Sequence, residues 1–267
     1  MRTLMDLMDL RGRVALVTGG AGHIGSAMAD ALAELGARIA VLDLDPEACA
    51  GAARRLEGRW GGEAMAVPVD LEREEQVRSA PGQVLERFAR LDVLVNCAAF
   101  AGTSALPGWV TPFLEQSAAT WRRALEVNLT APFLLTQLCV PALRASGHGS
   151  VINVASLYGL AGPDLRLYEG TPMGNPAAYG TSKGGLIQLT RWLATVLAPE
   201  VRVNAISPGG VERGQPEAFR ERYVARTPLA RMGTEEDFKG AAAFLASDAS
   251  AYLTGQNLIL DGGFTAW

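Results

Sequence analysis

The stretch Val14-Ala15-Leu16-Val17-Thr18-Gly19-Gly20-Ala21-Gly22-His23-Ile24-Gly25 decides the fold. Its apolar, β-branched start favours a buried strand, and the residues beyond it place apolar side chains at helical spacing until Gly36. Glycines between a strand and a helix let the backbone turn sharply, and the free amides at the helix N-terminus attract an anion. Asp43 directly follows the next predicted strand, at a position where a carboxylate accepts hydrogen bonds from a ribose diol. Together these features predict a dinucleotide-binding site.

Short β-rich runs alternate with helical patterns along the rest of the chain. Nearly continuous apolar strands separated by helices predict a doubly wound parallel α/β sheet of the Rossmann type, covered on both faces. No repeat or linker divides residues 1–267, so we predict a single NAD-binding domain. The seven predicted strands are Val14–Val17, Ile39–Leu42, Ala64–Val67, Val93–Asn96, Ser150–Val154, Arg202–Ile206 and Asn257–Leu260.

Composition excludes several classes of function. The chain has 267 residues and a formal net charge of −4, which predicts no binding of nucleic acid or of an anionic membrane. With three scattered cysteines and two histidines, neither a disulfide framework nor a metal site is expected. The start of the chain is unlike a secretory signal, and no apolar run reaches membrane-spanning length, so we expect a cytoplasmic protein.

A second stretch, Tyr179-Gly180-Thr181-Ser182-Lys183, places a phenol and an ammonium four residues apart. On a helix this spacing puts both side chains on one face, one turn apart. A lysine held beside a tyrosine favours the phenolate, which makes the phenol a usable proton donor or acceptor. The same spacing arises by chance on exposed helices, so its meaning depends on the other motifs of the chain.

Those motifs occur in one order along the chain, each next to a suitable predicted element. Over essentially its whole length the sequence resembles the short-chain dehydrogenases/reductases. The residues that carry the resemblance, besides the two stretches above, are Asp70-Leu71, Asn96-Cys97-Ala98-Ala99, Asn128 within Glu126-Val127-Asn128-Leu129, Ser156, and Pro208-Gly209.

The resemblance implies an NAD(P)-dependent oxidoreductase that interconverts a secondary alcohol and a ketone. Tyr179 is then the acid/base, and Lys183 lowers the pKa of its phenol and binds the nicotinamide ribose. Ser156 polarises the substrate oxygen, and Asn128 holds a water linked to Lys183. The cofactor-binding residues implied are Gly19, Gly22, His23, Ile24, Gly25, Asp43, Asp70, Leu71, Asn96, Ala98, Tyr179, Lys183, Pro208, Gly209 and Val211.

The sequence favours NAD over NADP. Asp43 would repel a 2′-phosphate, and the segment after it, Leu44-Asp45-Pro46-Glu47, is acidic. Asp45 is the alternative carboxylate for the same role. Two departures from the family pattern leave roles open: His23 replaces a glycine, in a glycine spacing that resembles the larger sugar-nucleotide branch, and Arg213 replaces a threonine that contacts phosphate or amide.

Two segments are expected to form substrate loops, residues 163–175 and 210–232. The first lengthens the interval between Ser156 and Tyr179 beyond that usual in the family, and its alternative role is packing on a neighbouring subunit. Together with Asn175-Pro176-Ala177-Ala178-Tyr179 and the ending 261–267, it resembles surface-glycan or flagellin-modification and gluconate 5-dehydrogenase-like oxidoreductases.

This likeness favours a polar, polyhydroxylated substrate: a sugar, polyol or nucleotide sugar. The alternatives are a reductase of a 3-oxoacyl or secondary-metabolite carbonyl and, in another class, a non-catalytic NAD-binding redox sensor. The resemblance also implies a homotetramer, or a dimer.

Overall fold

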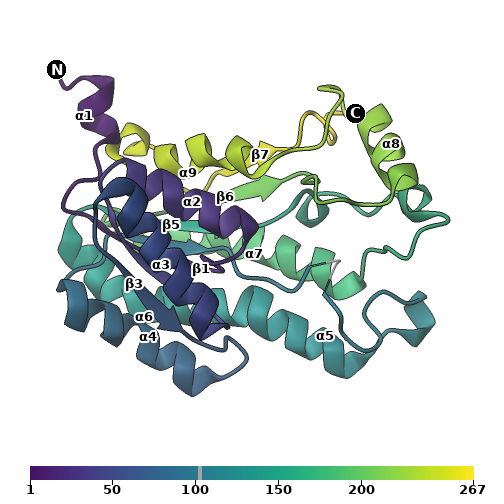
Figure 1. Ribbon diagram of the computed structural model, residues 1–267, viewed down its shortest axis with the longest axis horizontal. Coiled ribbons are helices and arrows are strands. Elements are labelled where there is room, and N and C mark those ends of the chain that lie inside the picture. The colour runs from purple at the N-terminus through teal and green to yellow at the C-terminus, as the bar shows by residue number, and fades with distance from the viewer. Residues whose placement is uncertain (102–103) are drawn as a thin grey trace.

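The computed structural model describes residues 1–101 and 104–267. Within these residues seven strands form one parallel sheet: β1 Val14–Thr18, β2 Arg38–Asp43, β3 Ala64–Pro68, β4 Val93–Asn96, β5 Gly149–Val154, β6 Val201–Pro208 and β7 Asn257–Leu260. Their order is β3-β2-β1-β4-β5-β6-β7, with helices on both faces (Figure 1). The structure confirms the predicted Rossmann-type sheet and all seven strands, several of them slightly longer than predicted.

Two apolar layers hold the helices against the sheet. Alternate side chains of β1 point to opposite faces, so Leu16 joins one layer and Val17 the other. α4, α6 and α7 pack on the face of Leu16, and α2, α3 and α9 on the face of Val17. The helices of the described part of the chain are α1 Leu4–Met8, α2 His23–Glu34, α3 Pro46–Trp60, α4 Glu74–Phe88, α5 Ala118–Leu125, α6 Ala131–Ser146, α7 Ala177–Leu197, α8 Glu217–Arg226 and α9 Lys239–Ala246.

The topology brings the predicted strand-end motifs together at the carboxyl ends of the parallel strands. β1 pairs with both β2 and β4, so the chain reverses its direction of winding between these strands. In such sheets ligands bind in the crevice outside the carboxyl ends of the strands at the reversal. The glycine-rich turn, Asp43, Ala98, Ser156 and Pro208 all lie at or just beyond those ends.

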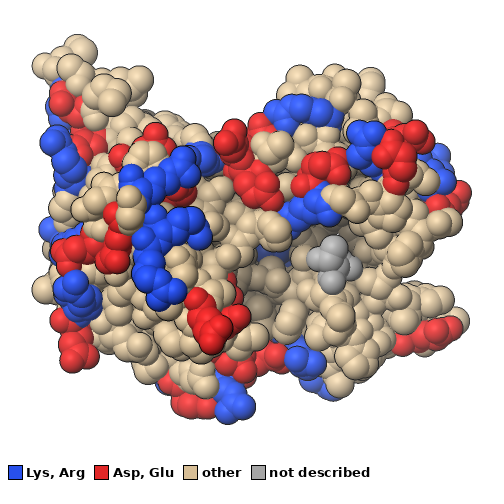
Figure 2. All heavy atoms as spheres, viewed as in Figure 1, with Lys and Arg blue, Asp and Glu red and all other residues tan. Residues whose placement is uncertain are grey.

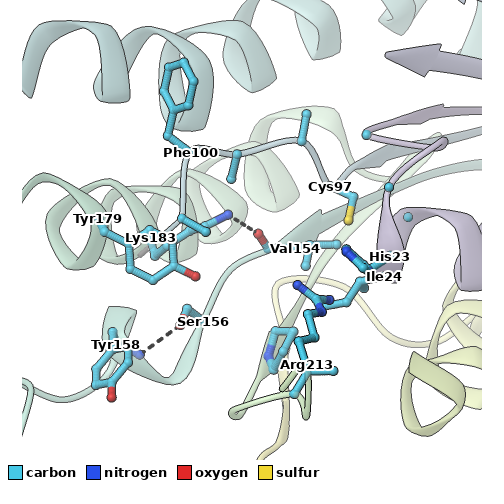
Figure 3. A pocket seen from close by; sticks show the side chains of 18 of the residues that line it. His23, Ile24, Cys97, Phe100, Val154, Ser156, Tyr158, Tyr179, Lys183 and Arg213 are labelled. Atoms are coloured by element: carbon cyan, nitrogen blue, oxygen red, sulfur yellow. Dashed lines mark hydrogen bonds between the residues drawn. The ribbon is translucent and has the colours of Figure 1, made fainter. Parts of the chain in front are cut away.

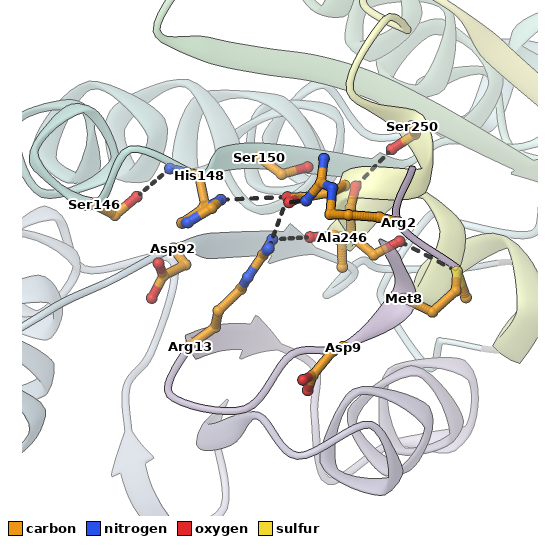
Figure 4. Close-up of polar contacts among 12 residues, drawn as sticks. Arg2, Met8, Asp9, Arg13, Asp92, Ser146, His148, Ser150, Ala246 and Ser250 are labelled. Atoms are coloured by element: carbon orange, nitrogen blue, oxygen red, sulfur yellow. Dashed lines mark hydrogen bonds and ion pairs between the residues drawn. The ribbon is translucent and has the colours of Figure 1, made fainter. Parts of the chain in front are cut away.

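At the opposite end of the strands, several polar side chains gather around Asp248. Asp248 accepts hydrogen bonds from Arg2 and Arg13, each at 2.7 Å, and lies 3.3 Å from His148 Nδ1 (Figure 4). Burial alone would raise the pKa of Asp248, but these cations outweigh it and lower the pKa to about 2. No helix among the described residues is long and apolar enough to cross a membrane.

Candidate active site

A cavity of about 680 Å³ runs along the carboxyl ends of the strands, and Figure 2 shows the hollow on this face of the molecule. Nearly all of the predicted site residues line it, although they come from segments far apart in the sequence. These are Gly19, Gly22, His23, Ile24, Gly25, Asp43, Asp70, Leu71, Ala98, Ser156, Tyr179, Lys183, Pro208, Gly209 and Val211.

The glycine-rich turn is a cradle that larger residues would fill. Gly19 has a φ of +65°, and a Cβ there would lie 2.9 Å from the Cα of Ala98. A Cβ on Gly25 would lie 2.2 Å from the carbonyl oxygen of Gly19. Gly22 is the N-cap of α2, and no described side chain caps this helix. Its first backbone amides are therefore available to bind an anion in the cavity. These features fit the pyrophosphate of a dinucleotide.

The carboxylate of Asp43 is held at the neighbouring strand end. Its Oδ2 accepts a hydrogen bond from the amide of Ala21 at 3.1 Å, and its Oδ1 accepts one from Leu44 at 2.8 Å. The alternative acid, Asp45, is outside the cavity lining and caps α3 by accepting from the amides of Glu47 and Ala48.

Two predicted site residues, Asn96 and Asn128, lie behind the cavity lining. Asn96 is buried, and its Nδ2 donates to Asn153 Oδ1 at 2.8 Å, while Asn153 donates to Thr190 on α7 at 2.9 Å. This chain of bonds ties β4, β5 and α7 together beneath the catalytic residues. Asn96 therefore holds these elements in position, and its predicted contact with the cofactor stays a prediction.

Asn128 lies in a π-helical turn, Glu126–Thr130, that joins α5 to α6. Its Oδ1 accepts from the amide of Phe100 at 2.8 Å, and its Nδ2 donates to the Phe100 carbonyl and to Ser182 Oγ, each at 3.0 Å. The side chain thus fixes the loop after β4 to α7, which sets the wall opposite Tyr179.

α7 carries Tyr179 and Lys183 on one face, as the spacing predicts. Lys183 Nζ lies 6.0 Å from the centre of the Tyr179 ring and donates to the Val154 carbonyl at 2.6 Å (Figure 3). The lysine is only 2% exposed, and burial lowers its pKa to about 8. Ser156 follows β5, and its Oγ accepts from the amide of Tyr158 at 3.2 Å.

The pKa of Tyr179 differs from the sequence-based expectation. Burial raises it, whereas a hydrogen bond with Ser156 and the charge of Arg213 act in the opposite direction. Burial therefore decides the direction of the shift, and the lowering by Lys183 stays a prediction; the ammonium is itself buried and donates to the Val154 carbonyl. The phenol is therefore protonated at neutral pH and is ready to donate.

The end of the cavity beyond Ser156 is walled by aromatic and sulfur-containing side chains. Tyr158 and Tyr168 share a hydrogen bond between their hydroxyls at 2.7 Å, and Tyr168 packs on Phe219 with ring centres 5.3 Å apart. The cluster continues to the end of the chain, since Tyr223 stacks on Phe264 at 4.6 Å. The further lining residues at this end include Phe100, Leu157, Met173 and Met232.

Residues 163–175 contribute to this wall. The segment reaches the cavity through Tyr168, Met173, Gly174 and Asn175. Two of its charged residues contact protein: Arg166 pairs with Asp164 at 2.8 Å, and Arg226 of α8 also donates to Asp164. The pair with Arg226 joins the segment to α8, and its role as a substrate loop stays a prediction.

Sequence reasoning missed the wall because its members come from three separate segments. Phe219 and Tyr223 lie one turn apart on α8 and form an apolar stripe, which indicates a helix face that packs on other residues. That stripe was the available signal. It was obscured by the arginines and glutamates that dominate the same helix.

Comparisons with known proteins agree with this geometry. The family model described as "Enoyl-(Acyl carrier protein) reductase" matches residues 19–265. The chain is 37% identical to the rhamnolipids biosynthesis 3-oxoacyl-[acyl-carrier-protein] reductase of Pseudomonas aeruginosa, covering 96% of this chain and 97% of that protein. The protein belongs to the short-chain dehydrogenase/reductase family.

Other members of the short-chain dehydrogenases/reductases show how widely substrates vary at this similarity. The cis-4-hydroxycyclohexanecarboxylate dehydrogenase of Sinomonas cyclohexanicum is 36% identical, with 95% of this chain and 97% of that protein covered. A crystal structure of gluconate 5-dehydrogenase from Burkholderia cenocepacia J2315, in complex with NADP and tartrate, matches with a TM-score of 0.88 at 31% identity, covering 99% and 100% of the two chains. The protein is therefore an oxidoreductase that uses a nicotinamide cofactor.

Proposed function

We propose that this protein is an NAD(H)-dependent enzyme that interconverts a secondary alcohol and a ketone whose carbon body is largely apolar. The observation that carries the proposal is the aromatic wall of Tyr158, Tyr168 and Phe219 directly beyond Ser156 and Tyr179. Apolar groups are favoured where they displace water from such a surface. We therefore prefer the carbonyl reductase alternative to the polyhydroxylated substrate that the sequence favoured.

The chain's own residues account for the proton part of the reaction. When bound, the nicotinamide supplies or accepts the hydride. In reduction, Tyr179 donates its phenolic proton to the carbonyl oxygen, and Ser156 holds that oxygen by a second hydrogen bond. Lys183 places a positive charge beneath the phenol below about pH 8, which stabilises the phenolate that proton donation creates.

A second candidate is the sugar or polyol dehydrogenase. It is supported by the polar groups that do reach the cavity, Asn175 and Gln215, together with the hydroxyls of Tyr158 and Tyr168. The similar structure named a gluconate 5-dehydrogenase is consistent with this reading.

A substrate panel separates the two candidates. We expect kcat/KM to be at least about tenfold higher for cyclic and medium-chain secondary alcohols than for gluconate, galactose and xylitol, because a few buried apolar carbons supply ~1–3 kcal/mol each. The measurement is NADH formation at 340 nm with matched alcohol concentrations. A higher value for the polyols would reinstate the polyhydroxylated substrate.

Cofactor choice is a second expected result. NADH should bind at least about tenfold more tightly than NADPH, since Asp43 repels a 2′-phosphate and no described lysine or arginine pairs with Asp43 to offset this. Fluorescence titration with both cofactors measures the ratio, and Asp43→Ala should reduce it. Equal affinities in the wild type would remove Asp43 from this role.

We further propose that the chain assembles as a homotetramer. α7 exposes Trp192 and Val196, one turn apart and 55% and 44% accessible, and α6 exposes Phe133. An apolar helix face of this kind is typical of a subunit interface. Light scattering at micromolar concentration should give four times the mass of one chain, and Trp192→Glu should lower it. A monomeric wild type would contradict the proposal.

A further inference from the structure

Three polar side chains meet at the rim of the cavity, and each comes from a different part of the chain. His23 begins α2, Arg213 follows β6, and Glu235 begins the short 3₁₀ turn Glu235–Phe238. Glu235 Oε1 accepts from Arg213 Nε at 3.2 Å and lies 3.5 Å from His23 Nδ1. One carboxylate oxygen thus links the glycine-rich turn to the loop on the other side of the cavity.

The backbone fixes Glu235 relative to Arg213. Val211 forms an isolated parallel bridge with Gly233, and the amide of Glu212 donates to the Gly233 carbonyl at 2.9 Å. Thr234 and Asp237 form a capping box that holds the turn in which Glu235 lies. The segments that carry Arg213 and Glu235 are therefore held together independently of their ion pair.

The side chain of Arg213 has hydrogen-bond donors available to a ligand in the cavity. Among its side-chain nitrogens, only Nε has a hydrogen-bond partner among the described residues, so both terminal nitrogens remain available. Figure 3 shows its guanidinium beside His23 and Ile24, which carry the uncapped first amides of α2. Burial raises the pKa of Tyr179 and of Cys97, and the positive charge of Arg213 acts against this rise at both groups, so its field extends across the cavity.

We propose that Arg213 binds the cofactor pyrophosphate at the start of α2, and that Glu235 positions Arg213 and links it to His23 across the cavity. The inference rests on the proposed use of NAD(H). A guanidinium offers a planar pair of donors that matches phosphate oxygens, which the threonine usual at this position does not. Glu235 is a positioning residue, since it acts through Arg213.

Binding measurements with fragments of the cofactor test the assignment without turnover. We expect Arg213→Met to raise the Kd of NADH, followed by fluorescence, and of ADP-ribose, followed by competition, each about tenfold, with less than a twofold change for adenosine. The Kd of NADH should also rise with salt, and less steeply in the variant. Arg220→Met, on the exposed Arg220–Glu217 pair of α8, is the matched control and should leave all three affinities unchanged.

A double-mutant cycle tests Glu235. Glu235→Ala should raise the Kd of NADH about threefold in the wild type and should have no further effect in Arg213→Met, because its contribution passes through that arginine. Tighter NADH binding by Glu235→Ala would mean that Glu235 repels the phosphates, which would overturn its positioning role. If Arg213→Met is unstable, Arg213→Lys replaces it and should give an intermediate loss, because it keeps the charge without the paired donors.

Other outcomes would overturn the assignment of Arg213. If Arg213→Met leaves the affinities for NADH and ADP-ribose unchanged but raises the KM of the carbonyl substrate, Arg213 binds an anionic group of the substrate instead. An equal loss for adenosine would indicate general damage to the site. A wild type that binds no NADH would contradict the proposed function itself, which is a separate result.

Discussion

Tyr179→Phe should lower kcat by more than about a thousandfold and change the Kd of NADH by less than twofold. The hydroxyl of Tyr179 is the one acid placed beside Ser156 on the described cavity wall, and burial keeps it protonated. Removing it leaves the carbonyl oxygen without a proton donor, whereas the glycine-rich turn and Asp43 are untouched. Steady-state kinetics and fluorescence titration measure the two quantities separately.

Tyr252→Phe is the control for this result, because Tyr252 is fully exposed and outside the cavity lining. It should retain wild-type kcat. If Tyr179→Phe kept more than a tenth of the wild-type rate, another group would have to supply the proton.

Lys183→Met should abolish most activity and yet stabilise the folded protein at neutral pH. The ammonium of Lys183 is buried, and burial lowers its pKa from an ordinary value of 10.5 to about 8. Below pH 8 both the folded and the unfolded chains carry the proton, so the folded chain bears the full cost of a buried charge, on the order of 3 kcal/mol. Methionine keeps much of the volume without the charge.

The same lysine gives the stability a defined pH dependence. Between about pH 8 and 10.5 the unfolded wild type binds more protons at this position than the folded one, so the free energy of unfolding rises with pH. Thermal melts of wild type and Lys183→Met should therefore differ most at pH 7 and converge towards pH 10.5. A variant less stable than wild type at pH 7 would show that the bond to the Val154 carbonyl outweighs the desolvation of the charge.

The sheet and the cofactor half of the site could be predicted because their signals are local. A strand, a glycine turn and a helix follow one another within β1 and α2, and Asp43 ends the very next strand. Tyr179 and Lys183 lie on one turn of α7, so their proximity follows from helix geometry alone.

The substrate-binding half of the site was harder to predict from the sequence, because its contacts join residues far apart in the chain. Tyr168 belongs to a segment whose charges suggested a polar loop, yet Asp164 and Arg166 pair with each other and leave the aromatic residue to the cavity. Asn96 has the residue type of a ligand contact, and only its bond to Asn153 reveals a supporting position. Whether a polar side chain binds a ligand or another part of the protein depends on tertiary packing.

The direction of the Tyr179 pKa shift could not be predicted from the Tyr179–Lys183 motif either. The spacing of Tyr179 and Lys183 indicated a lowered phenol pKa, but burial affects both groups and reverses the direction. The link between His23, Arg213 and Glu235 joins three distant segments, so no local pattern predicts it.

The central claim, that this protein transfers hydride between a nicotinamide and a carbonyl carbon, is tested most directly by isotope transfer. The enzyme is incubated with a panel of ketones and aldoses and with NADH in which both C4 hydrogens of the nicotinamide are deuterium, and the alcohols are analysed by mass spectrometry. The account predicts one deuterium at the carbinol carbon of the wild-type product and none above background with Tyr179→Phe. A wild-type protein that binds NADH but transfers no deuterium to any ketone or aldose tested would contradict the account and favour a non-catalytic NAD-binding role.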